Sequence, residues 1–340
     1  MGCNRRLGGF PLWLNRFSPH WALLWVVVTP GSWHAQAAAF AYIANELSNS
    51  VSVIDTARNT VAATVPVGNL PIGVAGTPNG KFVYVANAGS HFVSVIAADT
   101  NAAVSEVAMG PAPLGIAVTP DGKHVYVAHA TSAVSPGIVS VIDTVLNDVV
   151  ARITVGASPH YVAITPDGAH AYVTNQLSRT VSVIATARKQ VSATIPVGLF
   201  PTGVAIASDG KRAYVTNAGD NTVSVIDTAT NSVLVTIPVG KDPIAIAVTP
   251  DGKQAYVANC SGGNTVSVID TADNNVVSTI PLGTCPGAVA ITPDGKRAYV
   301  ANTDDKPGTI SVIETATRTL VATIAVGDAP SGLVIIPTSP

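Results

Sequence analysis

The side chains best suited to chemistry in this chain are those that interrupt a recurring motif. His129 stands where six other copies of the motif have Asn. Of the two residues that follow a recurring proline in each copy, the second is Gly or Ala in the other copies, whereas one copy has His160-Tyr161. His91 lies in a neighbouring loop. Imidazoles gathered at one site can bind a metal or act as acid and base. His129, His160 and Tyr161 are therefore the candidate catalytic residues, and His91 joins them as a candidate ligand-binding residue.

No H-x-H or H-E-x-x-H spacing accompanies these histidines, and two or three of them on one rim arise readily by drift. The sequence thus favours tolerated variation of loop and channel over a metal or catalytic site. His124 and His170 follow turns on the opposite face and are expected to be surface residues.

Acidic residues form a second candidate group. Asp304 and Asp305 are the densest cluster, followed by Lys306-Pro307-Gly308. The other acidic residues expected in loops of the same face are Glu46, Asp220, Asp242 and Asp328. A ring of carboxylates can hold Ca²⁺ or attract a cationic ligand. Because no EF-hand-like run of ligands is present, a solvated rim is favoured. We expect no cofactor, with a metal ion as the alternative, and retain Asp304 and Asp305 as candidate ligand-binding residues.

Cys260 and Cys285 are the only cysteines after residue 37. Both fall in loops expected on the same face, so in an oxidising compartment they are predicted to form a disulfide. Two free thiols are the alternative. Neither cysteine has a histidine nearby in the repeat, so a catalytic cysteine is not expected.

A repeat of about forty residues positions all of these side chains. Its clearest copy contains four apolar runs closed by turn residues: Ile244–Thr249, Gln254–Asn259, Thr265–Asp270 and Val276–Pro281. Runs of this length and composition predict four β-strands. A four-stranded sheet that is apolar on both faces must stack against copies of itself, as in a β-propeller. The second strands carry seven tyrosines: Tyr42, Tyr84, Tyr126, Tyr172, Tyr214, Tyr256 and Tyr299.

The two ends of the repeat region complement each other. The first copy begins at its second strand, and the chain ends with an unpaired first strand, Ser331–Ile336. We therefore predict an all-β fold in which residues 38–340 form one seven-bladed propeller of four-stranded antiparallel blades, closed by residues 331–336. The Gly-x-x-Pro links between blades and the loops after the second strands are expected to share one face, here called the top face. The largest insertion, Ala130–Gly137, lies in one of these loops.

Residues 1–37 do not belong to the repeat. Arg5, Arg6 and Arg16 precede an apolar run, Trp21–Val28, which is followed by Ala35-Gln36-Ala37. This order is typical of a cleaved secretory signal peptide. An eight-residue run cannot cross a bilayer core, which needs about twenty residues, so no transmembrane segment is expected. The alternatives are an uncleaved anchor and a misassigned start. We predict an exported protein, periplasmic or extracellular at the cell surface.

Composition excludes some functions. The 18 basic and 20 acidic residues form no basic stripe, which argues against nucleic acid as a partner. All four tryptophans lie before residue 38, so a propeller without the leader lacks the aromatic side chains that commonly hold quinone cofactors or carbohydrate.

Ala171–Asn175 and Ala213–Asn217 both read Ala-Tyr-Val-Thr-Asn. With the flanking Thr-Pro-Asp-Gly-Lys and Thr-Val-Ser-Val-Ile-Asp-Thr segments, residues 40–336 resemble the YVTN family of β-propeller repeat proteins. The resemblance implies a secreted or cell-surface protein, with haem d1 domains of nitrite reductases and seven-bladed lactonases as structural relatives. It transfers no catalytic residue, and it implies structural roles for the motif: tyrosine packing between blades, asparagine satisfying loop backbone, and Asp-Gly forming a turn.

Two functions follow as hypotheses. The first is a non-enzymatic, monomeric propeller that binds a protein or cell-surface ligand through its top face. The alternative is an enzyme of the lactonase, lyase or redox (haem d1-like) type, with His129, His160 and Tyr161 at the mouth of the central channel.

Overall fold

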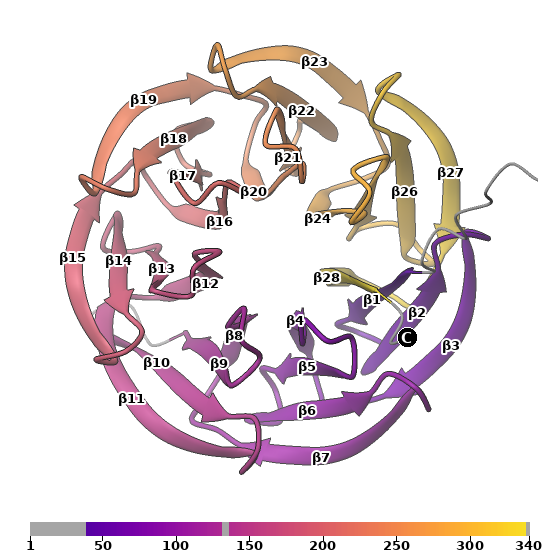
Figure 1. Cartoon of the computed structure of the whole chain (residues 1–340). Coiled ribbons are helices and arrows are strands. Elements are labelled where there is room, and N and C mark those ends of the chain that lie inside the picture. Colours follow the sequence, from indigo (N-terminus) through magenta and orange to yellow (C-terminus); the bar gives the residue numbers. More distant parts are fainter. Residues whose placement is uncertain (1–38, 131–135, 338–340) are drawn as a thin grey trace, which may run out of the picture. The chain divides into compact units, whose positions relative to one another are not determined.

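Residues 39–130 and 136–337 are described by the computed structural model, and within them the chain forms seven four-stranded antiparallel sheets. The sheets stand as blades around a central axis (Figure 1). This confirms the predicted seven-bladed β-propeller. The predicted leader, residues 1–37, lies outside the described residues, as do residues 131–135 of the largest insertion.

Each blade contributes one strand to each of four concentric layers. The innermost strands are β28 (Pro330–Pro337), β4 (Pro71–Gly76), β8 (Pro113–Val118), β12 (Pro159–Ile164), β16 (Pro201–Ile206), β20 (Pro243–Val248) and β24 (Pro286–Ile291). The second strands are β1 (Ala39–Asn45), β5 (Phe82–Asn87), β9 (His124–His129), β13 (His170–Asn175), β17 (Arg212–Asn217), β21 (Gln254–Asn259) and β25 (Arg297–Asn302). The third strands are β2 (Ser50–Asp55), β6 (Phe92–Ala97), β10 (Pro136–Asp143), β14 (Thr180–Ala185), β18 (Thr222–Asp227), β22 (Thr265–Asp270) and β26 (Thr309–Glu314). The outer strands are β3 (Thr60–Pro66), β7 (Ala102–Ala108), β11 (Asp148–Ala157), β15 (Gln190–Pro196), β19 (Ser232–Pro238), β23 (Asn275–Pro281) and β27 (Thr319–Ala325).

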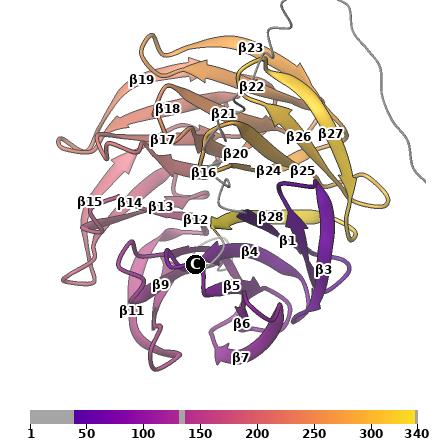
Figure 2. The ribbon, with the colours of Figure 1, turned by 45° about the vertical axis from the view of Figure 1, so that its right-hand side comes forward.

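The last strand closes the ring. β28 pairs antiparallel with β1, placing Val334 opposite Tyr42, and the first blade has the order β28-β1-β2-β3. Figures 1 and 2 both show yellow β28 beside indigo β1. The predicted closure by the C-terminal strand is thereby confirmed. We number the blades from this one, so that blade two begins with β4 and blade seven with β24.

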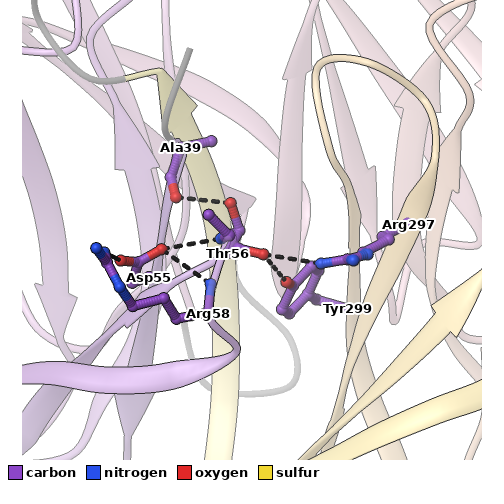
Figure 3. Close-up of polar contacts among 7 residues, drawn as sticks. Ala39, Asp55, Thr56, Arg58, Arg297 and Tyr299 are labelled. Atoms are coloured by element: carbon purple, nitrogen blue, oxygen red, sulfur yellow. Dashed lines mark hydrogen bonds and ion pairs between the residues drawn. The ribbon is translucent and has the colours of Figure 1, made fainter. Parts of the chain in front are cut away.

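Blade seven is also joined to blade one by polar contacts (Figure 3). The Arg297 guanidinium and the Tyr299 hydroxyl donate to the Thr56 carbonyl over 2.9 and 3.3 Å. Thr56 is itself held, because its hydroxyl donates to the Ala39 carbonyl over 2.7 Å. Two side chains of the last blade thus bind a turn of the first.

Tyrosines of the second strands occupy the interfaces between blades. All seven are at most 1% exposed. The Tyr42 hydroxyl donates to Asn101 of blade two over 2.9 Å, and the Tyr172 hydroxyl donates to Asn231 of blade five over 2.9 Å. Burial raises the pKa of Tyr42 to about 12, so the hydroxyl remains a donor. The structure therefore gives these tyrosines the packing role that the family resemblance implied.

The turns between first and second strands lie at the opposite end of the blades from the links. In blade three, Asp121 accepts hydrogen bonds from the Thr119 hydroxyl and the Lys123 amide, at 2.6 and 3.0 Å, and Gly122 has φ +71°. Glycine adopts this backbone at little cost, which explains the Asp-Gly pair. The described part of the chain contains no helix long and apolar enough to span a bilayer.

Candidate functional site

Every link between blades passes through one residue with left-handed backbone. These residues are Leu70, Ala112, Ser158, Phe200, Asp242, Cys285 and Ala329, with φ between 47 and 54°. The carbonyl of each accepts a hydrogen bond of 2.9 to 3.0 Å from the first loop residue after the next second strand, as Leu70 does from Ala88. Links and loops therefore form one hydrogen-bonded top face, as predicted from the repeat.

His91 is part of this hydrogen-bonded frame. It ends the loop of blade two with φ 59°, and its Nδ1 accepts a hydrogen bond of 3.3 Å from the Ala112 amide. At the equivalent position of blade one, the Asn49 side chain accepts from the Leu70 amide over 3.0 Å. His91 thus makes the link contact that an asparagine makes elsewhere.

His129 is buried at the end of β9, with 3% of its surface exposed. Its Nδ1 lies 3.1 Å from the Pro111 carbonyl and its Nε2 lies 2.9 Å from the Ser140 hydroxyl. A carbonyl only accepts, so Nδ1 carries the proton and Nε2 accepts from Ser140. Burial lowers the pKa of His129, which keeps the imidazole neutral. His129 is not among the residues that line the axial cavity.

The asparagines that His129 replaces make comparable contacts. The Asn175 amide donates to the hydroxyls of Thr180 and Ser182 on the third strand, over 3.1 and 2.9 Å. The family resemblance implied that these asparagines would satisfy loop backbone. Their amides donate mainly to third-strand hydroxyls, and Asn217 also satisfies link backbone, because its side-chain oxygen accepts from the Gly198 amide over 3.1 Å.

The acidic residues of the top face also support the loops. Asp305 accepts from the Thr284 amide and hydroxyl over 3.1 and 2.5 Å, and from the Thr309 hydroxyl. Burial raises the pKa of Asp305, but these hydrogen bonds outweigh that effect and hold the pKa below its usual range. Asp304 is exposed. Among the residues described, no three His, Cys, Asp or Glu side chains are grouped to hold a metal ion.

Cys260 and Cys285 are joined by a disulfide, as predicted. Cys260 begins the top loop of blade six, and Cys285 lies in the link from blade six to blade seven. The bond fastens this loop to the outgoing link. Cys285 is further held by its amide, which donates to Asn264 over 3.1 Å.

An axial cavity of about 100 Å³ lies between the inner strands of all seven blades. The aliphatic and glycine residues that line it are Ile72, Gly73, Val74, Leu114, Gly115, Ile116, Gly203, Val204, Ala245, Ile246, Ala288, Val289, Gly332 and Leu333. His160 and Tyr161 of β12 complete the lining. Among the described residues of the lining, these two have the only polar side chains.

The His160 and Tyr161 rings lie 5.3 Å apart, centroid to centroid, at 36°. Nδ1 of His160 is buried without a hydrogen-bond partner, and burial lowers the pKa of His160 to about 4. The Tyr161 amide donates to the Thr174 hydroxyl over 3.0 Å, which fixes the backbone of β12 at this point. The structure therefore brings these two candidates together and separates them from His91 and His129.

In the other six blades, the residue equivalent to Tyr161 is Gly or Ala, which allows the inner strands to pack closely. A Cβ on Gly115 would lie 2.3 Å from the His160 carbonyl oxygen, and one on Gly332 would lie 1.9 Å from the Ile72 carbonyl oxygen. Blade four alone places a large ring at this position.

Exposed apolar side chains on the top face were missed by the sequence analysis. Leu47 and Leu177 hold equivalent loop positions and are 62% and 40% exposed. Leu70 and Phe200 hold equivalent link positions and are 39% and 48% exposed. We call these four residues the top apolar set. The sequence feature that could have revealed these residues is their recurrence at matching positions of the repeat.

Two family models match parts of the chain. A model described as "Lactonase, 7-bladed beta-propeller" matches residues 31–138, and one described as "Choice-of-anchor I domain" matches residues 91–241. His160 and Tyr161 lie within the second match and outside the first. A comparison with curated proteins found no match.

Several solved structures are similar. Hydrazine synthase from Kuenenia stuttgartiensis is 27% identical with a TM-score of 0.73, over 81% of this chain and 92% of that one. A periplasmic gluconolactonase of Pseudomonas aeruginosa is 19% identical with a TM-score of 0.74, over 88% and 99%. The dihydro-heme d1 dehydrogenase NirN is 18% identical with a TM-score of 0.65, over 87% and 74%. The last two likenesses show the fold alone.

Proposed function

We propose that this chain is an exported, non-enzymatic β-propeller that binds a protein partner through its top face. The observation that supports this best is the top apolar set, which exposes large apolar side chains at the ends of the blades. Large apolar side chains exposed on a folded protein are candidates for an interaction site, and aromatic anchors such as Phe200 contribute most to binding.

The frame beneath these side chains is rigid. Leu70 and Phe200 have left-handed backbone, and their carbonyls accept from Ala88 and Ala218 over 2.9 and 3.0 Å. Each also packs over a glycine of the next loop: a Cβ on Gly219 would lie 2.8 Å from the Phe200 ring. A preorganised surface loses little conformational entropy on binding.

The charges around the set suggest the partner's chemistry. Six carboxylates accompany it on the top loops: Glu46, Asp220, Asp242, Asp304, Asp305 and Asp328. Three basic residues, Arg179, Lys241 and Lys306, lie on the same loops. We expect a partner surface that presents both apolar and basic side chains, because complementary potentials guide association.

Export is supported by the predicted leader and by the Cys260–Cys285 disulfide, which persists in an oxidising compartment. A periplasmic protein among the similar structures agrees with it. We further propose that the repeat is of the YVTN type and that the protein is a monomer before it meets its partner.

Photo-crosslinking tests the proposal. A photoreactive phenylalanine analogue is introduced at position 70 or 200, and irradiation is carried out in the cell envelope of the source organism. We expect a covalent adduct with one protein from either position. The matched control is position 145, where Val145 is 86% exposed on a turn at the opposite end of blade three. Adducts from position 145 but not from 70 or 200 would contradict the proposal.

A second candidate function is hydrolysis of a lactone at His160 and Tyr161. It is favoured by the pair's place in the axial cavity; the lactonase model matches residues 31–138, which do not include the pair. The cavity argues against it, because its volume of about 100 Å³ is well below the roughly 300 Å³ of typical ligand pockets. Gluconolactone turnover by the wild type, abolished by His160→Phe, would support this candidate; turnover that His160→Phe leaves unchanged, or no turnover, would remove it.

A further inference from the structure

The side chains that line the axial cavity are aliphatic on all sides but one. Six inner strands contribute only aliphatic side chains and glycine, and β12 contributes His160 and Tyr161. No charged side chain is among the lining residues. The two rings are neighbours, with centroids 5.3 Å apart, so both polar groups belong to the same side of the cavity.

The packing of His160 determines which nitrogen carries the proton. Nδ1 is buried and has no partner among the described residues. A buried N–H without an acceptor is costlier and rarer than an unpaired acceptor, so the proton belongs on Nε2. Burial also lowers the pKa of His160 to about 4, so the ring is neutral at neutral pH. His160 therefore offers one N–H donor.

Tyr161 offers a second donor. Burial raises the pKa of its hydroxyl, which stays protonated. No described residue accepts a hydrogen bond from it. The backbone of Tyr161 is held through Thr174, whose hydroxyl in turn donates to the Thr202 carbonyl over 2.6 Å, so this part of β12 is anchored to blade five.

We infer that the axial cavity is a binding site for a small uncharged molecule that has one acceptor oxygen and an otherwise apolar body. His160 Nε2–H and the Tyr161 hydroxyl donate to the oxygen, and the aliphatic side chains of the other six blades enclose the remainder. A cavity of about 150 Å³ holds benzene, so a volume of about 100 Å³ suits a smaller molecule such as a short ketone.

Anions fit this cavity less well. A carboxylate would lose its hydration without meeting a positive charge, which is costly. Replacing a poorly held water by an apolar group gains affinity. This inference is independent of the proposed protein docking, which uses the top apolar set.

Acetone is a suitable probe, followed by NMR of protein labelled with ¹⁵N-histidine. We expect the His160 signals to report the neutral Nε2–H form, and acetone to shift them saturably in the millimolar range. Tyr161→Phe removes one hydrogen bond and should weaken acetone binding roughly fivefold. The matched control is Tyr172→Phe, which removes a hydroxyl bound to Asn231 away from the cavity and should leave acetone binding unchanged.

Isobutene has the shape of acetone without the oxygen, and we expect it to bind more weakly than acetone. The inference is overturned by a proton on Nδ1, by His160 signals that acetone does not shift saturably, or by Tyr161→Phe binding acetone as the wild type does. Equal binding of isobutene and acetone also overturns it. Should Tyr161→Phe fail to fold, the comparison of acetone with isobutene in the wild type decides between these results.

Discussion

His91 and His129 each replace an asparagine in a hydrogen bond that the repeat makes elsewhere. An imidazole and a carboxamide both present a donor and an acceptor, so the exchange preserves the contact: His91 accepts from Ala112 as Asn49 accepts from Leu70. Histidines at a shared rim are therefore accounted for by loop structure. At the residue scale, His160 and Tyr161 are the departures from the repeat that its own hydrogen bonds do not explain.

The exchange of Asn for His at position 129 has a consequence for the adjacent link glycine. A Cβ on Gly156 would lie 2.7 Å from Cγ of Asn175, whereas a Cβ on Gly110 would lie 3.7 Å from Nδ1 of His129. Gly156→Ala should lower the free energy of unfolding by about 1–3 kcal/mol, because it overpacks the site. Gly110→Ala should change it by less than about 0.5 kcal/mol. Denaturant unfolding measures both.

The control for this pair is His129→Asn, which restores the common residue. In that background Gly110→Ala should become as costly as Gly156→Ala. Equal losses for the two glycine variants in the wild-type background would show that the link glycines are needed for a reason other than the side chain beneath them.

The burial of His160 predicts a loss of stability in acid. The folded protein binds a proton at His160 only near pH 4, whereas the unfolded chain does so near pH 6.5. Between these values the unfolded state holds more protons, so the free energy of unfolding falls as the pH falls from 6.5 to 4. The contribution amounts to roughly 3 kcal/mol at pH 4.

Thermal unfolding of the wild type and of His160→Phe over this pH range measures the effect. The variant should lose less stability than the wild type between pH 6.5 and 4. His129→Asn is the comparison for the other buried imidazole, whose pKa is also lowered by burial. Parallel pH curves for the wild type and His160→Phe would rule out the predicted proton linkage.

At the scale of elements, the strands and the face of the links were predictable, but the backbone conformation of the links was not. Alternation of apolar residues placed the first strand of blade six at Ile244–Thr249, and the structure has β20 at Pro243–Val248. The left-handed backbone of Leu70 and Phe200 had no such signal, because that conformation is usually left to Gly or Asn. Leu70 and Phe200 of the top apolar set were missed for this reason, since their place on the links depends on a backbone conformation that these residue types do not suggest.

The disulfide acts between two such elements, the loop of blade six and the link to blade seven. Cys260→Ala together with Cys285→Ala should lower the free energy of unfolding by about 3 kcal/mol, because the bond closes a loop between residues 25 apart. Denaturant unfolding with and without reductant measures this. Reductant should destabilise the wild type by a similar amount and leave the double variant unchanged; a wild type insensitive to reductant would contradict the prediction.

For the whole molecule, ring closure could be predicted by counting repeats. The first copy lacks its inner strand, and the chain ends with an inner strand that has no further strands after it, so the two complete one blade. The axial cavity could not be predicted in this way. Its volume depends on how closely seven inner strands approach, which is set by contacts such as Gly332 against the Ile72 carbonyl. The sequence indicated that Tyr161 departs from the pattern, but not that His160 Nδ1 would lack a partner.

Deletion of residues 330–340 should open the ring. It removes β28, exposes the edge of β1 and uncovers side chains packed against Ile336, which is 4% exposed. We expect a loss of more than about 3 kcal/mol in the free energy of unfolding, and aggregation through the exposed edge. A peptide of residues 330–337 added in trans should restore stability. A truncated protein that unfolds at the wild-type denaturant concentration would contradict the closure.

Partner affinity of the top-face variant is the most direct test of the central claim, which is that the propeller binds a protein through its top apolar set. The double variant Leu70→Ser/Phe200→Ser is compared with the double variant Val145→Ser/Leu146→Ser. In the wild type, Val145 and Leu146 are 86% and 68% exposed at the opposite end of blade three. Affinity for the cross-linked partner, measured by calorimetry, should fall more than about tenfold for the first pair, as expected for anchoring side chains, and should be unchanged for the second. Unchanged affinity for the Leu70 and Phe200 variant would contradict the account.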